Sequence, residues 1–502
     1  MFEVLTKLIT LSETRPNAPA FSQGERTLSY DELSARVAAL SQDISQHNTT
    51  DDSIAIFAPN GLEWVVADLG LAHAGKTMVP LPTFFSQDQL RFIIQDAHVR
   101  HVLVTAETRA RAQDLGLAFT EITLNKPSIQ PASAKAPLRS TLGRSKNAQR
   151  IIYTSGTTGT PKGVRLGDRQ ISASARGLLT ASGATQDDRY LSVLPFSLLL
   201  EQIAGICVPL LAGASVTLAA DAAAAALEGD AAPLMDAFNA TNPSVSVIVP
   251  SLLKAWVKTM AATGTTAPKN LRFVAVGGAP VNETLAQSAW DLGVPVYEGY
   301  GLSECCSVVS VNHPDNRTQG TVGKPILGVF VTLKNGEIIV HGDTVMSGYL
   351  GHNANTTKPV RAWPTGDLGT FTQNGALRIL GRKDNLIVTQ AGRNISPEWV
   401  EDMCETHSNI AKSVLTHTPD RGLILIVLPN PVTTDPTAIS EVLHKQISKL
   451  PDYARPDHIV MIDANEASKN ELFTPLGDVR RGTCTAFAET RLQQDSPMPK
   501  TS

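Results

Sequence analysis

The chain has 502 residues, of which 42% are apolar, and this length allows two or more globular units, each with its own hydrophobic core. Its formal net charge of −4 arises from 43 basic and 47 acidic residues that form no long run of one sign. A surface that binds the phosphate backbone of nucleic acid needs a basic stripe, so nucleic acid is not an expected partner.

The five cysteines and the histidines argue against a disulfide framework and against a metal site built by the protein alone. No two cysteines have CxxC spacing, and no histidines have HxH or HxxxH spacing. We therefore expect a reducing, cytoplasmic location. The N-terminal segment carries Glu3, Lys7 and Glu13 among its apolar residues, unlike a signal peptide. No stretch reaches the roughly 18 uncharged apolar residues of a membrane helix, so no membrane span is expected.

Short apolar runs alternate with helical stretches from Ser53 onward. The second helix of this region begins with Ser86 and has Gln89 three residues later, which is the spacing of a capping box. Strands that are apolar on both faces and alternate with helices predict a mostly parallel sheet covered by helices, and hence an α/β fold. The strands expected here are Ser53–Ala58, Thr77–Pro80 and His101–Val104.

The stretch Pro127–Asn147 is rich in Pro, Ala, Ser and Lys and is predicted to be a surface linker. The alternation then resumes, and a β-rich segment with a hairpin at Asn335–Gly336 is expected after Gly323. A small final unit should follow Arg382. The further strands expected are Ile151–Tyr153, Ser215–Leu218, Val245–Val249, Leu271–Val276, Val294–Tyr297, Ser413–Thr416 and Leu423–Leu428, with helices at Ser251–Met260 and Asn282–Leu292, from Ser396, and from about Thr437.

A glycine-rich loop directly follows the predicted strand Ile151–Tyr153. The ten residues from Thr154 to Gly163 hold three glycines, five hydroxyl side chains and Lys162. Such a loop can surround an oxyanion with backbone N–H groups, hydroxyls and a mobile ammonium, so it predicts polyphosphate binding. It is not a Walker loop, because Lys162 precedes the last glycine. The alternative is an ordinary surface loop, which the full string YTSGTTGTPKGV disfavours.

With this loop, the chain resembles the adenylate-forming superfamily of acyl-CoA synthetases, firefly luciferase and peptide-synthetase adenylation domains. The resemblance runs from about Thr27 to Arg481 and is closest in pattern to the fatty acyl-CoA ligases. Besides the loop it rests on the blocks TLSYDEL, GGAP at 277–280, EGYGLSE at 298–304, GEIIVHGDTVMSGYL, WPTGDLG at 363–369 and GRKDNLI at 381–387.

The resemblance implies ATP and Mg²⁺ as cofactors and assigns roles to single residues. Tyr300 would stack on adenine, Ser303 would contact the α-phosphate, and Glu304 would bind magnesium. Lys162, Ser303, Glu304 and the position of Asp478 would then be catalytic. The implied nucleotide- and cofactor-binding set is Thr154, Ser155, Gly156, Thr157, Thr158, Gly159, Gly278, Ala279, Glu298, Tyr300, Asp367 for the ribose, Arg382, and Gly392 near the thiol arm.

Three of these loops follow strands that end at Tyr153, Val276 and Tyr297. The carboxyl ends of parallel strands form the binding edge of an α/β sheet, so we expect the three loops to meet at one edge of one sheet.

The domain organisation implied is a large N-terminal α/β domain with a β-rich subdomain at 1–381, and a small mobile α/β domain at 382–502. Asp384 would be the hinge, and Mg-ATP would sit in the cleft between the domains. The implied activity is an acid–thiol ligase: a carboxylic acid becomes acyl-AMP, and a thiol of CoA or of a carrier protein's phosphopantetheine displaces AMP.

The acyl pocket is the least defined part of the site. It is assigned to Phe196, Leu198, Gly277 and Gly301, and its apolar character predicts a fatty or aryl acid. Leu198 stands where long-chain relatives have His, and the run from Phe196 to Leu200 can equally belong to the core. The pair Cys305–Cys306 is expected to form pocket wall, without a covalent role.

The most important departure from the family pattern is Asp478, which stands where a lysine is expected to approach the acid and the α-phosphate. A carboxylate there would repel both anions. Lys469, Arg480 and Arg481 are candidates to replace the lysine. The alternative function is a relative that binds nucleotide or acyl-AMP but is inactive in adenylation, or performs only the thiol-transfer half-reaction.

Overall fold

The computed structural model describes residues 1–47, 53–124, 138–139, 141–154, 161–228, 230–351, 361–388, 393–407, 409–418, 420–430, 436–473 and 479–494. The chain forms two compact units. The first comprises Met1–Thr332, Ile339–Trp363 and Thr372–Leu377, and the second comprises Leu333–Ile338, Pro364–Phe371 and Arg378–Ser502. These units are defined by packing and not by motion, so the hinge-linked domains 1–381 and 382–502 stay a prediction.

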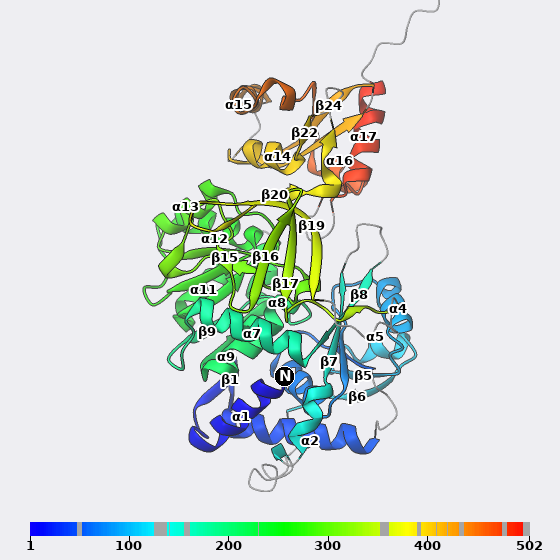
Figure 1. Cartoon of the computed structure of the whole chain (residues 1–502), viewed down its shortest axis with the longest axis vertical. Coiled ribbons are helices and arrows are strands. Elements are labelled where there is room, and N and C mark those ends of the chain that lie inside the picture. Colours follow the sequence, from blue (N-terminus) through cyan, green and yellow to red (C-terminus); the bar gives the residue numbers. More distant parts are fainter. Residues whose placement is uncertain are drawn as a thin grey trace, which may run out of the picture. The chain divides into compact units, whose positions relative to one another are not determined.

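A seven-stranded sheet in the first unit carries the glycine-rich loop. Its order is β18-β8-β7-β4-β3-β5-β6, and its strands are parallel except at β7–β8 and β8–β18. Helices α4 (Gln87–Asp96) and α5 (Arg109–Asp114) contribute to the hydrophobic core on this sheet (Figure 1). The strands are β3 (Ser53–Phe57), β4 (Thr77–Pro80), β5 (His101–Val104), β6 (Ala118–Glu121), β7 (Gln149–Thr154), β8 (Lys162–Gly167) and β18 (Gly348–Tyr349).

A nine-stranded sheet in the same unit carries the other motif loops. Its order is β15-β14-β13-β12-β11-β9-β10-β1-β2, and the strands from β13 to β1 are parallel. The strands are β1 (Pro19–Gln23), β2 (Arg26–Ser29), β9 (Arg189–Ser192), β10 (Ser215–Leu218), β11 (Val245–Ile248), β12 (Phe273–Val276), β13 (Val296–Tyr300), β14 (Ser310–Val311) and β15 (Lys324–Pro325).

The expectation that three motif loops share one sheet is therefore wrong. Strand β7, which precedes the first loop, belongs to the seven-stranded sheet, whereas β12 and β13, which precede the other two, belong to the nine-stranded sheet. Strand ends can be read from local sequence, but sheet membership depends on pairing between segments that are far apart in the chain.

A local signal defines the start of α4. The capping box is present at α4, where Gln89 N donates to Ser86 Oγ at 3.3 Å and Ser86 N donates to Gln89 Oε1 at 2.9 Å. The other helices of the first unit are α1 (Phe2–Thr14), α2 (Tyr30–His47), α3 (Leu62–His73), α7 (Asp168–Ser182), α8 (Leu199–Glu201), α9 (Val208–Ala212), α10 (Ala220–Leu227), α11 (Ala232–Thr241), α12 (Pro250–Thr263) and α13 (Glu283–Asp291). A π-helical segment, Gln202–Cys207, joins α8 to α9.

The predicted hairpin forms at Asn335–Gly336, whose φ angles of 53° and 79° suit a two-residue turn. It connects β16 (Val329–Lys334) to β17 (Glu337–Gly342). These strands join β19 (Ala362–Phe371) and β20 (Leu377–Arg382) in a four-stranded sheet.

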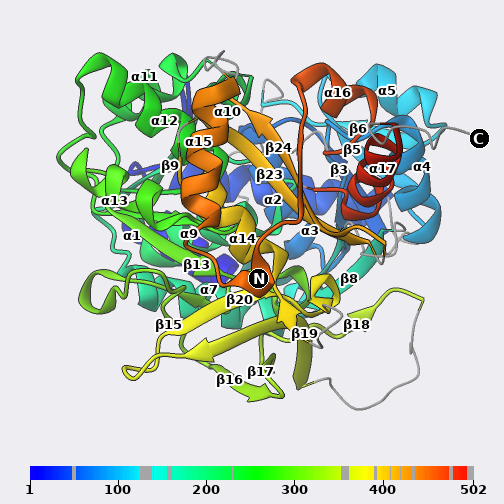
Figure 2. The same cartoon turned by 90° about the horizontal axis from the view of Figure 1, so that it is seen from above.

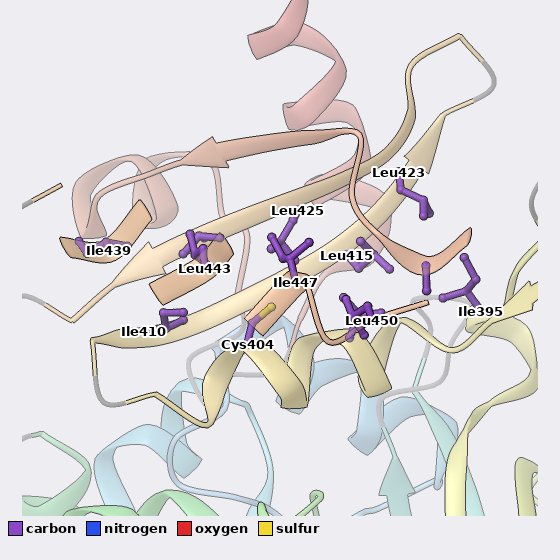
Figure 3. Packing of buried hydrophobic residues seen from close by; sticks show 13 residues of the cluster. Ile395, Cys404, Ile410, Leu415, Leu423, Leu425, Ile439, Leu443, Ile447 and Leu450 are labelled. Carbon is purple, nitrogen blue, oxygen red and sulfur yellow. The ribbon is translucent and has the colours of Figure 1, made fainter. Parts of the chain in front are cut away.

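The second unit contains a three-stranded sheet that is covered by helices on both faces (Figure 2). Successive residues of β24 point to opposite faces: Leu425 packs in a cluster with α14 and α15, and Ile426 packs in another with α16 and α17. Figure 3 shows the first cluster, in which Ile447 and Leu450 meet Leu415 and Leu425. The elements are α14 (Pro397–Glu405), β23 (Ile410–Thr418), β24 (Gly422–Pro429), α15 (Pro436–Ile447), β25 (His458–Met461), α16 (Ala464–Lys469) and α17 (Arg481–Gln494), with the short pair β21 (Ile387–Val388) and β22 (Asn394–Ile395).

Candidate functional site

Strands β7 and β8, which pair in antiparallel register, precede and follow the glycine-rich segment in sequence. Thr154 and Lys162 are paired across the two strands and so flank the loop. The predicted phosphate-binding residues between them, Ser155, Gly156, Thr157, Thr158 and Gly159, lie outside the described residues. Lys162 is exposed, and its Nζ lies 5.6 Å from the ring centroid of Tyr349.

The segment after β13 makes a tight turn that places Ser303 and Glu304 in a short 3-10 helix, Ser303–Cys305. A Cβ at Gly301 would lie 1.5 Å from the backbone oxygen of Ser307, so this position requires glycine. The turn is completed by two residues with positive φ, Cys306 at 55° and Ser307 at 81°. Such angles are costly outside glycine and persist where surrounding contacts fix the backbone. One such contact is the hydrogen bond of 2.6 Å from Ser174 Oγ to the Cys306 oxygen.

Glu304 is half-buried and is held by the segment that contains Met346 and Tyr349. The hydroxyl of Tyr349 donates a hydrogen bond of 2.7 Å to Oε1 of Glu304. The backbone N–H of Met346 donates to the Glu304 carbonyl at 2.8 Å. Tyr349 lies in the block GDTVMSGYL, so the motif was visible in the sequence, but its contact with Glu304 depends on the fold.

Glu298 points into the protein interior. Its carboxylate accepts a hydrogen bond of 3.1 Å from Asn312 Nδ2 and lies 3.6 Å from the Arg317 guanidinium. Burial raises the pKa of this carboxyl, and the backbone and Arg317 oppose that shift. These contacts tie β13 to the following loop. A nucleotide contact of Glu298 stays a prediction.

Gly277, Gly278 and Ala279 follow β12 directly. A Cβ at Gly277 would lie 3.3 Å from the Gly299 oxygen, and Gly278 has a φ of 88°. The loop after β12 therefore approaches the backbone of β13 closely, and glycine at 277 permits this approach. Tyr300, on β13, is half-buried.

The predicted acyl-pocket residues Phe196 and Leu198 differ in exposure. Phe196 is fully buried and stacks on Trp64 at a centroid distance of 5.1 Å, whereas Leu198 is half-buried at the start of α8. The stacking of Phe196 on Trp64 is typical of a hydrophobic core. A role of Phe196 and Leu198 in substrate binding stays a prediction.

The second unit brings Asp367 and Arg382 together. Arg382 Nη1 donates to Asp367 Oδ1 at 3.0 Å and to the Thr365 oxygen at 3.4 Å. Gly366, which lies between Thr365 and Asp367 in the sequence, has a φ of 75°, and its N–H donates to Glu337 Oε1 at 3.3 Å. The TGD segment is therefore a fixed turn that presents a buried carboxylate next to a guanidinium.

The structure does not test the predicted roles of three residues in the second unit. Asp384 is exposed in the 3-10 helix Lys383–Asn385. Gly392 and Asp478 lie outside the described residues.

The described residues offer a divalent cation one carboxylate ligand, Glu304, and not a complete site made of protein side chains. The described part of the chain contains no group of three or more His, Cys, Asp or Glu side chains that could hold a metal ion. Glu304 offers a hard oxygen donor, and no described cationic side chain forms an ion pair with it. Magnesium is commonly held by one or two carboxylates together with substrate phosphates, which matches this donor set.

None of the helices in the described ranges is long and apolar enough to cross a membrane. The chain is similar to 2-succinylbenzoate–CoA ligase of Bacillus cereus, with 27% identity over 462 residues that cover 88% of this chain and 91% of the relative. It is 27% identical over 455 residues to a long-chain-fatty-acid–CoA ligase of Mycobacterium bovis, which covers 76% of this chain and 73% of the relative.

The fold also matches solved structures. That of o-succinylbenzoate CoA synthetase from Bacillus subtilis with its acyl-adenylate has a TM-score of 0.76 at 20% identity, over 95% of this chain and 97% of that one. An anthranilate CoA ligase in complex with anthranoyl-AMP has a TM-score of 0.81 at 17% identity, over 98% of both chains. These matches confirm the predicted α/β fold class. The profile of the AMP-binding enzymes matches residues 10–350, more than half of the sequence. As its motifs predict, the chain therefore belongs to the AMP-binding enzyme family.

Proposed function

We propose that this protein uses ATP to activate an apolar carboxylic acid as acyl-AMP and then transfers the acyl group to a thiol. The observation that carries the proposal is the grouping of Lys162 and Glu304 around Tyr349 in a chain of the AMP-binding enzyme family. One group is a mobile cation and the other a hard anionic ligand, and a magnesium-bound triphosphate requires both. The similar ligases act on 2-succinylbenzoate and on long-chain fatty acids, which supports an acid with a large apolar part.

In the first half-reaction, an oxygen of the acid's carboxylate attacks the α-phosphorus of ATP, and the bond from this phosphorus to the bridging oxygen breaks. Pyrophosphate leaves with the electron pair. The Lys162 ammonium would offset charge on the leaving phosphates, and Ser303 would donate to the α-phosphate. Magnesium, held by Glu304 and the phosphates, would supply further charge neutralisation.

Asp367 would accept hydrogen bonds from the ribose hydroxyls. Its carboxylate is buried and held by Arg382, so it is oriented before a nucleotide binds. An oriented acceptor loses less conformational freedom on binding, which favours affinity.

In the second half-reaction, the thiol of CoA or of a carrier protein's phosphopantetheine attacks the acyl carbon and AMP leaves. No nucleophile of the protein is needed. The cysteines support this mechanism, because all five are buried. Burial raises the pKa of Cys306 to about 12 and that of Cys484 to about 11, so neither is a thiolate at neutral pH.

A second candidate function is thiol transfer without efficient adenylation, and Asp478 favours it. Of the cations proposed to replace the missing lysine, Arg481 is bound to Glu398 and Glu401, and Arg480 pairs with Glu471 at 2.6 Å. Lys469 is exposed at the end of α16.

Both candidates can be tested by supplying the two half-reactions separately. Pyrophosphate release is measured with a panel of acids and ATP, and thioester formation is measured with ready-made acyl-AMP and CoA. The proposed function predicts acid-dependent release of pyrophosphate. Thioester formation without such release supports the second candidate, and the failure of both reactions would contradict both.

A further inference from the structure

Tyr349 contacts two candidate active-site residues that come from different sheets. Its hydroxyl donates a hydrogen bond of 2.7 Å to Oε1 of Glu304, and the Lys162 ammonium lies over its ring at 5.6 Å. Glu304 follows β13 of the nine-stranded sheet, whereas Lys162 begins β8 of the seven-stranded sheet. Tyr349 thus joins a loop of one sheet to a strand of the other.

The backbone fixes Tyr349 on both sides. Strand β18 pairs with β8, with Tyr349 opposite Val164, and Leu350 N donates to the Gly163 oxygen at 2.7 Å. The Trp363 ring packs edge-to-face against the Tyr349 ring at 5.8 Å. Together with the bond from Met346 to the Glu304 backbone, these contacts hold the hydroxyl at a fixed place relative to the carboxylate.

We propose that Tyr349 is a positioning residue that restricts Glu304 to a single metal-binding oxygen and thereby favours Mg²⁺ over Ca²⁺. This inference rests on the proposed function, in which Glu304 binds the cation of the metal–nucleotide complex. The tyrosine hydroxyl donates a hydrogen bond to Oε1, which makes this oxygen the weaker ligand for a cation, so Oε2 is the expected ligand.

Monodentate binding discriminates between the two cations. Mg²⁺ requires near-octahedral geometry and usually takes one oxygen from each carboxylate, whereas Ca²⁺ accepts six to eight oxygens and readily binds a carboxylate through both. Groups that hydrogen-bond a ligating carboxylate fix its orientation, and their loss typically lowers metal affinity 10- to 100-fold. Removing the hydroxyl should therefore weaken Mg²⁺ binding and leave Ca²⁺ binding less affected, because both oxygens become available.

The test is calorimetric binding of a non-hydrolysable ATP analogue to the full chain over a series of Mg²⁺ or Ca²⁺ concentrations. Tyr349→Phe retains the ring, and hence the contacts with Lys162 and Trp363. Tyr153→Phe is the matched control, because it also removes a hydrogen bond from a tyrosine hydroxyl to a carboxylate, here Asp96 at 2.6 Å.

Tyr349→Phe is expected to weaken the apparent Mg²⁺ affinity about tenfold and to lower the ratio of Mg²⁺ to Ca²⁺ affinity, with no change in Tyr153→Phe. An unchanged ratio in Tyr349→Phe would overturn the inference. A wild type that binds the analogue equally well with and without metal would instead contradict the proposed function, so the two failures are distinguishable.

A double-mutant cycle shows whether Tyr349 acts through Glu304. In a Glu304→Gln background, Tyr349→Phe should cause no further change in Mg²⁺ affinity, and an equal loss in both backgrounds would refute the positioning role. If Tyr349→Phe does not fold, Glu304→Gln provides the test. Its amide offers the cation only a neutral carbonyl oxygen in place of the oriented carboxylate, so the preference for Mg²⁺ over Ca²⁺ should weaken, and a fully preserved preference refutes the inference.

Discussion

Arg481 binds the carboxylate of Glu401 through both of its terminal nitrogens, with hydrogen bonds of 2.7 and 2.9 Å. It also donates to Glu398 Oε1 at 3.0 Å, so its guanidinium anchors α17 to α14 within the second unit. Bidentate pairs of this kind fix the geometry of an arginine. Arg481 is therefore committed to the core of its own unit and is a poor substitute for the lysine that Asp478 replaces.

Because Arg481 is bound by Glu398 and Glu401 and cannot replace the missing lysine, we predict that Asp478→Lys accelerates adenylation. Attack brings a carboxylate against a triphosphate, and one well-placed stabilising donor is worth about 2.7–4 kcal/mol, or roughly 100- to 1000-fold in rate. The rate of acid-dependent pyrophosphate release should rise by about this factor. The rate of thioester formation from ready-made acyl-AMP should stay the same in both proteins.

Asp478→Ala and Lys469→Ala are the controls for this prediction. A high rate of pyrophosphate release by wild type, unchanged in Asp478→Ala, would show that another cation stabilises the adenylation step. A loss of that activity in Lys469→Ala would then identify the cation.

Asp367→Ala should weaken nucleotide binding by roughly 1.5–3 kcal/mol, the range for a hydrogen bond to a charged group. Isothermal titration calorimetry with AMP measures the change. Asp343→Ala is the matched control, because it removes an exposed aspartate that pairs with Arg169 in the other unit. Equal AMP affinity in wild type and Asp367→Ala would remove Asp367 from the ribose site.

The preferred acid should be apolar, with a medium or long chain or an aryl group, because the segments Phe196–Leu200 and Val249–Leu253 carry no charge. Each buried methylene should add on the order of 0.8 kcal/mol to binding. The Michaelis constants of a homologous series of acids test this slope. Turnover that is highest with acetate or an amino acid, and that falls with chain length, contradicts it.

Glu201 should make stability depend on pH. Burial raises its pKa to about 8, and its carboxyl contacts Ser192 Oγ at 2.6 Å and the Tyr190 hydroxyl at 3.0 Å. In the unfolded chain this group ionises near pH 4.3. Because the folded pKa is raised, its contribution is complete below that pH and is lost as pH rises toward 8.

Glu201→Gln stays neutral and should lack this loss. Between about pH 5 and 8 the free energy of unfolding of wild type should fall by up to about 1.4 kcal/mol per pH unit relative to Glu201→Gln. Urea unfolding at a series of pH values measures the difference. Parallel curves for the two proteins would show that Glu201 is already ionised in the folded state.

Features set by neighbouring residues could be predicted from the sequence. The capping box at Ser86 and Gln89 and the turn at Asn335–Gly336 depend on residues at most three positions apart, and both are confirmed. The N-cap at Asn282 is similarly local, with its side chain accepting from Thr284 N at 2.8 Å.

Features that depend on contacts between distant parts of the chain could not be predicted from the sequence. The predicted surface linker Pro127–Asn147 includes Leu138, which is fully buried and whose oxygen lies 2.9 Å from His73 Nε2. The division of the motif loops between two sheets, and the contact of Tyr349 with Glu304, likewise depend on segments that are far apart in sequence. Composition and local pattern carry no information about such pairings.

The most direct test of the proposed function is pyrophosphate release from ATP by wild type and by Asp478→Lys, measured with a panel of carboxylic acids in the presence of CoA. The proposed function predicts acid-dependent release that is highest with an apolar fatty or aryl acid, is faster in Asp478→Lys, and is matched by equal amounts of AMP and thioester. Release that is the same with and without every acid, in both proteins, would contradict it.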